Sequence, residues 1–153
     1  MTLRFEILGE PVAKGRPRLT SFGGHARAYT PKKTRDAEDN IRAQVVRALP
    51  VGWRPIETAI CVRIIIRRTK PVSIPKSKPF PTQKPDIDNY VKSVLDAMNS
   101  VVFKDDAQIV LLEASKHYGI PSIFVEIDRV PEDTTCNCSL CVGYKNLVKE
   151  VEQ

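Results

Sequence analysis

The sequence predicts an α+β protein with a single domain, in which a mixed β-sheet is covered by helices. Short stretches of alternating apolar residues predict strands, longer stretches with helical spacing predict helices, and the two patterns follow one another along the chain. The predicted order is strand, helix, strand, helix, strand, strand. The 153 residues, 42% of them apolar, are enough to bury a core. We expect a domain of residues 1–131 and a short, helical, cysteine-containing tail of residues 132–153.

The N-terminal third is predicted to hold a strand, a long loop and a helix. Alternating apolar residues predict a strand over residues 2–8. Residues 9–29 are rich in glycine and proline, which predicts a long loop. Thr30 is the expected N-cap of the first helix, with Pro31 at its first position. This helix should end before Pro50, because proline cannot continue it.

The remaining elements are a strand, a central helix and two final strands. Residues 56–68 are rich in β-branched side chains and predict the second strand. Residues 70–84 hold four prolines and several lysines, so we expect an extended flap there or a plain linker. The central helix should follow Asp86 as its N-cap. Residues 108–118 and 122–130 predict the last two strands.

Four aspartates flank the central helix. Asp86 and Asp88 lie at its start, and Asp105 and Asp106 lie in the loop after it, which could fold back toward the start. Grouped carboxylates repel one another unless a cation or protons hold them, and Mg²⁺ prefers carboxylate oxygens. Lys92, one turn after Asp88, could pair with that carboxylate or contact a phosphate. A helix cap, a solvated helix face and a turn would explain the same residues without any metal.

The positive charge, with a formal net value of +6, is concentrated in two stretches without acidic residues. Residues 14–35 and 58–85 each hold seven basic residues. Such stretches beside an acidic cluster suit a nuclease, since cations hold DNA phosphates while carboxylates hold a metal. A solvated basic surface is the alternative. The candidate DNA-binding residues are Lys14, Arg16, Arg18, Arg27, Lys32, Lys33, Arg35, Lys76 and Lys84.

The central part of the chain contains several motifs of one known family in the same order. They are Asp-x-Asp-Asn from Asp86, a lysine four residues after the second aspartate, Leu-Asp-Ala from Leu95, and Asp-Asp-Ala-Gln from Asp105. Together they resemble the RusA family of Holliday junction resolvases. The segment from Gly9 to Arg18 also resembles the start of many phage and prophage members.

This resemblance implies a homodimeric, Mg²⁺-dependent endodeoxyribonuclease, with Mn²⁺ as a substitute, that resolves four-way DNA junctions by paired nicks. The family's catalytic and metal-binding aspartates correspond to Asp86, Asp88 and Asp106, and its functional lysine to Lys92. Asp105 is the adjacent acidic residue and a further candidate metal ligand. Two alternatives remain open: a non-catalytic protein that binds branched DNA, and a structure-selective nuclease of broader specificity.

The tail contains three closely spaced thiols. Cys136, Cys138 and Cys141 could hold a structural Zn²⁺ if Cys61, His117 or a partner chain supplied a fourth ligand. Free thiols, an Fe–S cluster and a disulfide are the alternatives, and a reducing cytosol disfavours the disulfide.

The sequence contains no candidate membrane segment. No apolar run approaches the ~20 residues that span a bilayer, and residues 1–20 carry charges where a signal peptide needs an apolar stretch. We therefore expect a cytoplasmic protein, bacterial or phage-encoded, with no membrane partner.

Overall fold

The computed structural model describes residues 1–16, 18–22, 25–130 and 142. The three tail cysteines, Cys136, Cys138 and Cys141, and the helix expected around them lie outside this part. A zinc site in the tail therefore stays a prediction. Of the other candidate ligands, Cys61 is fully buried in a strand of the sheet.

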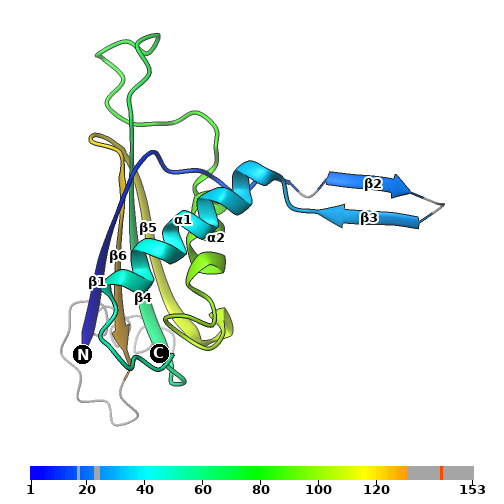
Figure 1. The fold of residues 1–153 in the computed structure, drawn as a ribbon. Coiled ribbons are helices and arrows are strands. Elements are labelled where there is room, and N and C mark those ends of the chain that lie inside the picture. The colour runs from blue at the N-terminus through cyan, green and yellow to red at the C-terminus, as the bar shows by residue number, and fades with distance from the viewer. Residues whose placement is uncertain (17, 23–24, 131–141, 143–153) are drawn as a thin grey trace, which may run out of the picture.

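A mixed four-stranded sheet forms the body of the protein (Figure 1). Its strands are β1 (Thr2–Leu8), β4 (Ile60–Arg68), β5 (Ile109–Tyr118) and β6 (Ser122–Arg129), in the order β1-β6-β4-β5. β4 and β5 are parallel, whereas β6 is antiparallel to both β1 and β4. The predicted α+β class and mixed sheet are confirmed.

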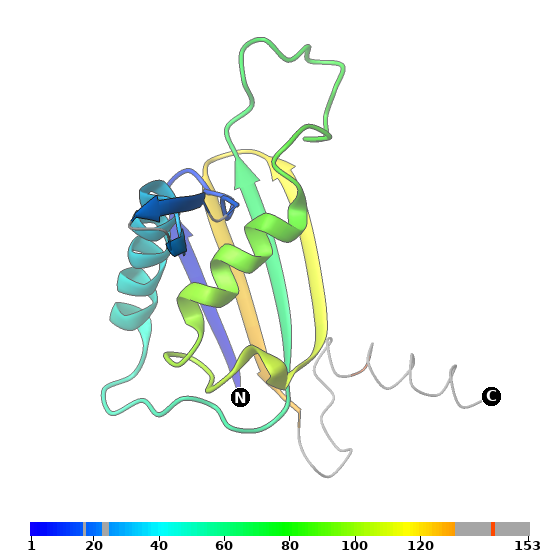
Figure 2. The same ribbon diagram turned by 90° about the vertical axis from the view of Figure 1, so that its right-hand side faces the viewer.

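Two helices cover one face of this sheet, α1 (Lys32–Ala48) and α2 (Ile87–Met98) (Figure 2). The core lies between the helices and the strand residues that alternate toward them, as the period-two pattern of β4 predicted. Among its members are Phe5, Ile7, Ile41, Val45, Ile60, Val62, Ile64, Ile66, Val91, Val94, Met98, Ile123, Val125 and Ile127. In the described part of the chain, no helix is long and apolar enough to cross a membrane.

The opposite face of the sheet carries a row of cross-strand ion pairs. Arg4 Nε lies 2.7 Å from Glu126 Oε2, and Arg63 Nη1 lies 3.3 Å from Glu126 Oε1. Arg63 Nε is also 2.8 Å from Glu113 Oε2, so Arg63 bridges two strands. The guanidinium of Arg63 is therefore already paired with carboxylates of the sheet. It belongs to one of the two basic stretches of the sequence, but its charge is compensated within the protein.

A β-hairpin stands where the sequence predicted only a loop. β2 (Arg18–Phe22) and β3 (His25–Tyr29) are antiparallel and project from the body (Figure 1). The loop prediction is therefore wrong for these residues. The register pairs Phe22 with His25, which leaves the two glycines at positions 23 and 24 as the connection. A Gly-Gly pair between two short runs is a hairpin signal, which the overall glycine and proline content of the segment obscured.

The first helix starts one position later than predicted. Its N-cap is Pro31 and not Thr30, and no side chain caps it. The reason is that Pro31 keeps an extended ψ of 143°, while its carbonyl accepts hydrogen bonds from the amides of Thr34 (3.0 Å) and Arg35 (3.2 Å). Helix α1 therefore begins with Lys32. No acidic side chain in its first turn offsets the positive end of the helix dipole.

The second strand is also shorter than predicted. β4 begins at Ile60, because Ile56 forms an isolated bridge with Phe103 instead of joining the sheet. The amide of Ile56 donates to Val102 O at 2.9 Å, and Lys104 N donates to Ile56 O at 2.9 Å. These bonds fix the loop after α2 at the C-terminal end of that helix.

Candidate functional site

Helix α2 presents the first pair of aspartates to solvent. Asp86 is its N-cap, as predicted, but its carboxylate makes no capping hydrogen bond. Asp88 lies in the first turn, where the helix dipole favours a negative charge. The other face of the helix packs on the sheet through Val91, Val94 and other buried residues. That packing leaves Asp88 and Lys92 exposed.

A largely apolar cavity of about 330 Å³ runs along α2 beside β5. Asp88, Lys92 and Asp106 line it. Its other lining residues are Ile87, Val91, Leu95, Asp96, Leu112 and Ala114. The structure therefore brings Asp88, Lys92 and Asp106 to one cavity, from the two ends of a helix.

The two aspartates after the helix have different environments. Asp105 caps the short 3₁₀ turn η1 (Asp106–Gln108): its Oδ1 accepts a 2.8 Å hydrogen bond from Ala107 N. Gln108 Oε1 in turn accepts from Asp105 N at 2.8 Å, which completes a capping box. Asp106 follows without a role in the cap and faces the cavity.

The donor chemistry at this site suits a hard divalent cation. Within the described ranges, no basic side chain forms an ion pair with Asp86, Asp88 or Asp106. Asp88 Oδ1 accepts only a long hydrogen bond of 3.4 Å from Asn89. The carboxylate oxygens are therefore available as ligands, which is the donor type that Mg²⁺ prefers.

One chain nevertheless gathers fewer carboxylates than expected. The described residues contain no group of three or more His, Cys, Asp or Glu side chains that could hold a metal. The cause is the position of the loop after α2, which stays at the C-terminal end of the helix and does not fold back to its start. A cation at Asp86 and Asp88 would need waters, substrate phosphate or another chain to complete its coordination.

The backbone just before Asp86 is held by side chains from the sheet, which the sequence reasoning did not find. Lys116 Nζ donates to Pro85 O at 2.9 Å and to Gln83 O at 3.2 Å. Arg68 Nη1 donates to Lys84 O at 3.3 Å. These contacts join residues that are far apart in the chain, so they cannot be predicted from a local sequence motif.

Lys14, one of the candidate DNA-binding residues, is already paired within the protein. Its ammonium forms ion pairs with Glu38 on α1, at 3.0 Å, and with Asp96 on α2. Its amide donates to Asn89 O at 2.8 Å. Burial would lower the pKa of Lys14, but hydrogen bonds to Asp96 and Glu38 outweigh it and raise that pKa. Lys14 ties the N-terminal segment to both helices.

The other basic candidates are spread over α1, the hairpin and the connection before α2. Arg16, Lys32, Lys33, Arg35, Lys76 and Lys84 are exposed, and Arg18 and Arg27 belong to strands of the hairpin. A cavity of about 440 Å³ is lined by Arg16, Lys33 and Thr34. Gly15 N donates to Thr34 Oγ1 there at 3.1 Å.

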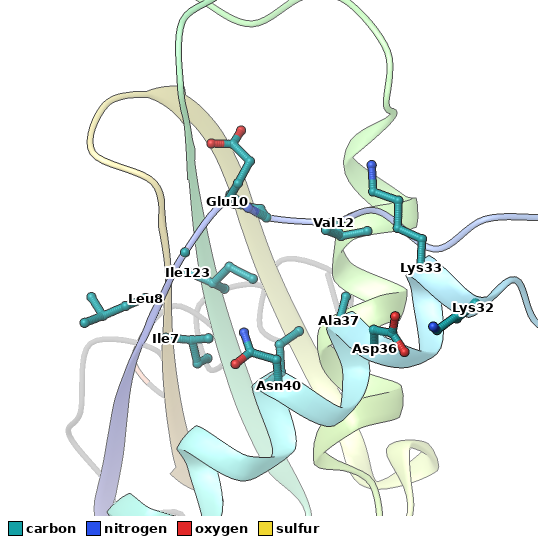
Figure 3. Close-up of a pocket in the computed structure, with 13 residues that line it drawn as sticks. Ile7, Leu8, Glu10, Val12, Lys32, Lys33, Asp36, Ala37, Asn40 and Ile123 are labelled. Atoms are coloured by element: carbon teal, nitrogen blue, oxygen red, sulfur yellow. The ribbon is translucent and has the colours of Figure 1, made fainter.

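A larger cavity, of about 480 Å³, lies between the end of β1 and the first turns of α1 (Figure 3). Lys32 and Lys33 line it, but so do Glu10 and Asp36. Because the two signs of charge are balanced, this cavity is less suited to a polyanion than the wholly basic wall at Arg16 and Lys33.

Unpaired carboxylates at the start of α2 and in η1, with exposed cations on neighbouring segments, are the side chains that a nuclease uses to hold a metal and DNA phosphates. Comparison with known proteins gives the family. The model of the family described as "Endodeoxyribonuclease RusA" matches residues 9–128, and the chain belongs to this family. The protein is therefore an endodeoxyribonuclease by family, and the family acts on branched DNA junctions.

The chain is also similar to a protein named "Uncharacterized protein YqaN" from Bacillus subtilis (strain 168). The two are 36% identical over 130 residues, which is 76% of this chain and 88% of that protein. The family match includes all four aspartates and ends before the tail cysteines.

Proposed function

We propose that this protein resolves four-way DNA junctions by paired nicks in a reaction that depends on Mg²⁺, with Mn²⁺ as a substitute. The observation that carries the proposal is the set of unpaired carboxylates at Asp86, Asp88 and Asp106, in a chain that belongs to a family of endodeoxyribonucleases. The exposed cations of α1 and of the connection before α2 would hold the phosphates of the DNA arms.

Asp86 and Asp88 are the residues that would hold the ion. A bound Mg²⁺ supplies Lewis acidity to the phosphate and acidifies a coordinated water. Asp88 is oriented by the first turn of α2, and the hydrogen bonds of Lys116 and Arg68 fix the backbone on which Asp86 stands. Asp105 is a weaker candidate ligand, because one of its oxygens caps η1.

Lys92 is proposed to stabilise negative charge on the phosphate. It lies one turn after Asp88 on the exposed side of α2 and lines the same cavity. Its ammonium makes no ion pair with any residue that the structure describes. A free ammonium beside a carboxylate pair is placed to offset charge that develops during phosphodiester cleavage.

A homodimer is part of the proposal. The edge strand β5 leaves Val110 and Leu112 each 43% exposed, and Leu112 lines the cavity. A second copy seated there would cover the apolar wall. Two sites in one dimer would cut two strands of a junction.

The direct test uses a supercoiled plasmid that extrudes a cruciform, beside a relaxed plasmid without one. We expect linear product from the cruciform plasmid alone, with Mg²⁺ and not with EDTA, because two nicks are made within one binding event. Tight binding to the cruciform without cleavage in any divalent metal would contradict the proposal and favour the non-catalytic alternative. Equal cleavage of both plasmids would favour a nuclease of broader specificity.

A further inference from the structure

The connection between β4 and α2, residues 69–85, is a built structure and not a plain linker. We call it the flap. Figures 1 and 2 show it extending beyond the end of the sheet, next to the start of α2. Its own turns are closed by hydrogen bonds from Ile74 N to Pro71 O at 3.0 Å and from Lys78 N to Pro75 O at 3.1 Å.

Side-chain contacts within the flap and with the body hold both of its limbs. The outgoing limb is fixed by Lys70, whose Nζ donates to Lys78 O at 2.9 Å and lies 5.5 Å from the ring centre of Tyr118. Thr69 Oγ1 donates to Glu10 Oε2 at 2.8 Å. The returning limb is fixed by the bonds of Lys116 to Gln83 O and Pro85 O. Lys70 and Lys116 thus satisfy backbone carbonyls of the flap, and no ligand is needed to account for its shape.

Phe80 is exposed on this anchored flap. Its side chain is 63% exposed, whereas the next residue, Pro81, is buried. Thr82 N donates to Phe80 O at 3.0 Å, which fixes the backbone on both sides of the aromatic residue. A large aromatic side chain held outside the core in this way contributes little to folding, and its exposed face is available to a partner.

The charge around Phe80 indicates the chemistry of that partner. The flap contains no acidic residue, and Lys76, Lys78 and Lys84 are exposed on it. A polyanion with accessible aromatic faces fits this combination, and unpaired nucleobases have such faces while paired bases inside a duplex do not. Phe80 is six residues from Asp86, a span of at most about 20 Å of chain.

We propose that Phe80 stacks on an unpaired base at the branch point of the DNA, while Lys76 and Lys78 contact the adjoining phosphates. The inference rests on the proposed function, because it gives that nuclease its means of distinguishing a branch from a continuous duplex. Because the limbs are anchored and Phe80 is only six residues before Asp86, stacking would fix the branch point relative to the proposed site of cleavage.

The test compares Phe80→Ala with Phe80→Trp and with the control Val72→Ala, which truncates an apolar side chain of the flap that is fully exposed. Affinity is measured in Ca²⁺ for an immobile four-way junction carrying 2-aminopurine at the branch point, and for a linear duplex of the same arms. Stacking on a base is worth about 10-fold or more in affinity. We expect that loss for Phe80→Ala on the junction only, together with loss of the 2-aminopurine fluorescence change on binding. Phe80→Trp and Val72→Ala should behave as wild type.

An unchanged fluorescence response and junction affinity in Phe80→Ala would overturn the inference, and so would an equal loss of affinity for junction and duplex. Because binding is measured without cleavage, these outcomes are separate from a failure of the proposed function. The wild-type protein could cut no branched DNA and still show the Phe80-dependent fluorescence change. That outcome would contradict the proposed nuclease function but support the stacking of Phe80 on a base.

Discussion

Asp105 and Asp106 are adjacent in the chain, but their carboxylates have different partners. Asp105 accepts the amide of Ala107 and begins η1, so its side chain contributes to local stability. The carboxylate of Asp106 makes no hydrogen bond or ion pair within the described part of the chain, and Asp106 lines the cavity beside α2. Side-chain partners thus separate a structural aspartate from a candidate catalytic one.

This difference predicts opposite effects of two alanine substitutions. Asp105→Ala should lower the free energy of unfolding by about 1 kcal/mol, as loss of an N-cap does, and lower Tm by about 2–4 °C. Asp106→Ala should leave Tm nearly unchanged, but should reduce junction cleavage by more than the ~100-fold typical of losing an outer-shell group at a metal site. Thermal melts and single-turnover cleavage measure the two effects. A larger cleavage defect in Asp105→Ala than in Asp106→Ala would contradict this assignment, and would make Asp105 the candidate catalytic residue.

At the scale of elements, Lys14 joins three segments through one ammonium group. Its partners are Glu38 on α1 and Asp96 on α2, while its own backbone belongs to the segment that leads into the hairpin. The side chain is 20% exposed, so these ion pairs are screened less than surface pairs. We infer that Lys14 sets the position of α1 and the hairpin relative to the helix that carries Asp88.

Removing this ion pair should destabilise the protein in a manner that depends on pH. Lys14→Met should lower the free energy of unfolding by about 1–2 kcal/mol near neutral pH, since two carboxylates lose their partner. Because folding raises the pKa of Lys14, its contribution is complete below the usual lysine pKa of about 10.4, and is lost as pH rises through the raised value. The difference between wild type and Lys14→Met should therefore shrink above that pH.

Lys104→Met is the matched control, because the pair of Lys104 with Glu57 is long, at 3.7 Å, and both side chains are at least 70% exposed. We expect its effect to stay below about 0.5 kcal/mol at every pH. Burial also raises the pKa of Tyr90, so the stability of both variants should decline in alkali. Denaturant unfolding between neutral pH and pH 11 measures these differences. Equal effects of the two substitutions would contradict the assigned role of Lys14.

At the scale of the whole molecule, the candidate site lies at one edge of the sheet, and the proposed DNA-binding segments extend away from it. β5 supplies the apolar wall of the cavity, while the hairpin and the flap extend from the body (Figure 1). This arrangement separates the proposed polyanion-binding segments from the core. It also leaves a partly apolar edge strand, β5, on which the proposed second copy could pack.

Much of this architecture follows from local sequence patterns. Alternation predicted β1, β4 and β6, and helical spacing predicted the buried face of α2, because burial on one side imposes those periods. The hairpin was missed because its Gly-Gly signal lies within a segment rich in turn residues. The start of α1 was misplaced by one residue for a similar reason, since Thr30 and Pro31 both fit a helix start.

The site itself was only partly predictable. Motif spacing predicted Asp86, Asp88 and Lys92 as site residues; all three are exposed, and Asp88 and Lys92 line one cavity. It could not show that Lys14 pairs with Asp96, 82 positions away, nor that Lys116 holds the backbone before Asp86. Such contacts depend on how the strands and helices pack, and the sequence of each element alone contains no signal for them.

The central claim is that the carboxylates at the start of α2 perform the cleavage. The most direct measurement is single-turnover cleavage of an immobile four-way junction in Mg²⁺ by Asp88→Asn, with binding to the same junction measured in parallel. The control is Asp39→Asn, an exposed aspartate on α1. We predict that Asp88→Asn abolishes cleavage but still binds the junction, while Asp39→Asn cleaves as wild type does. Cleavage at the wild-type rate by Asp88→Asn would contradict the account and place the active site elsewhere.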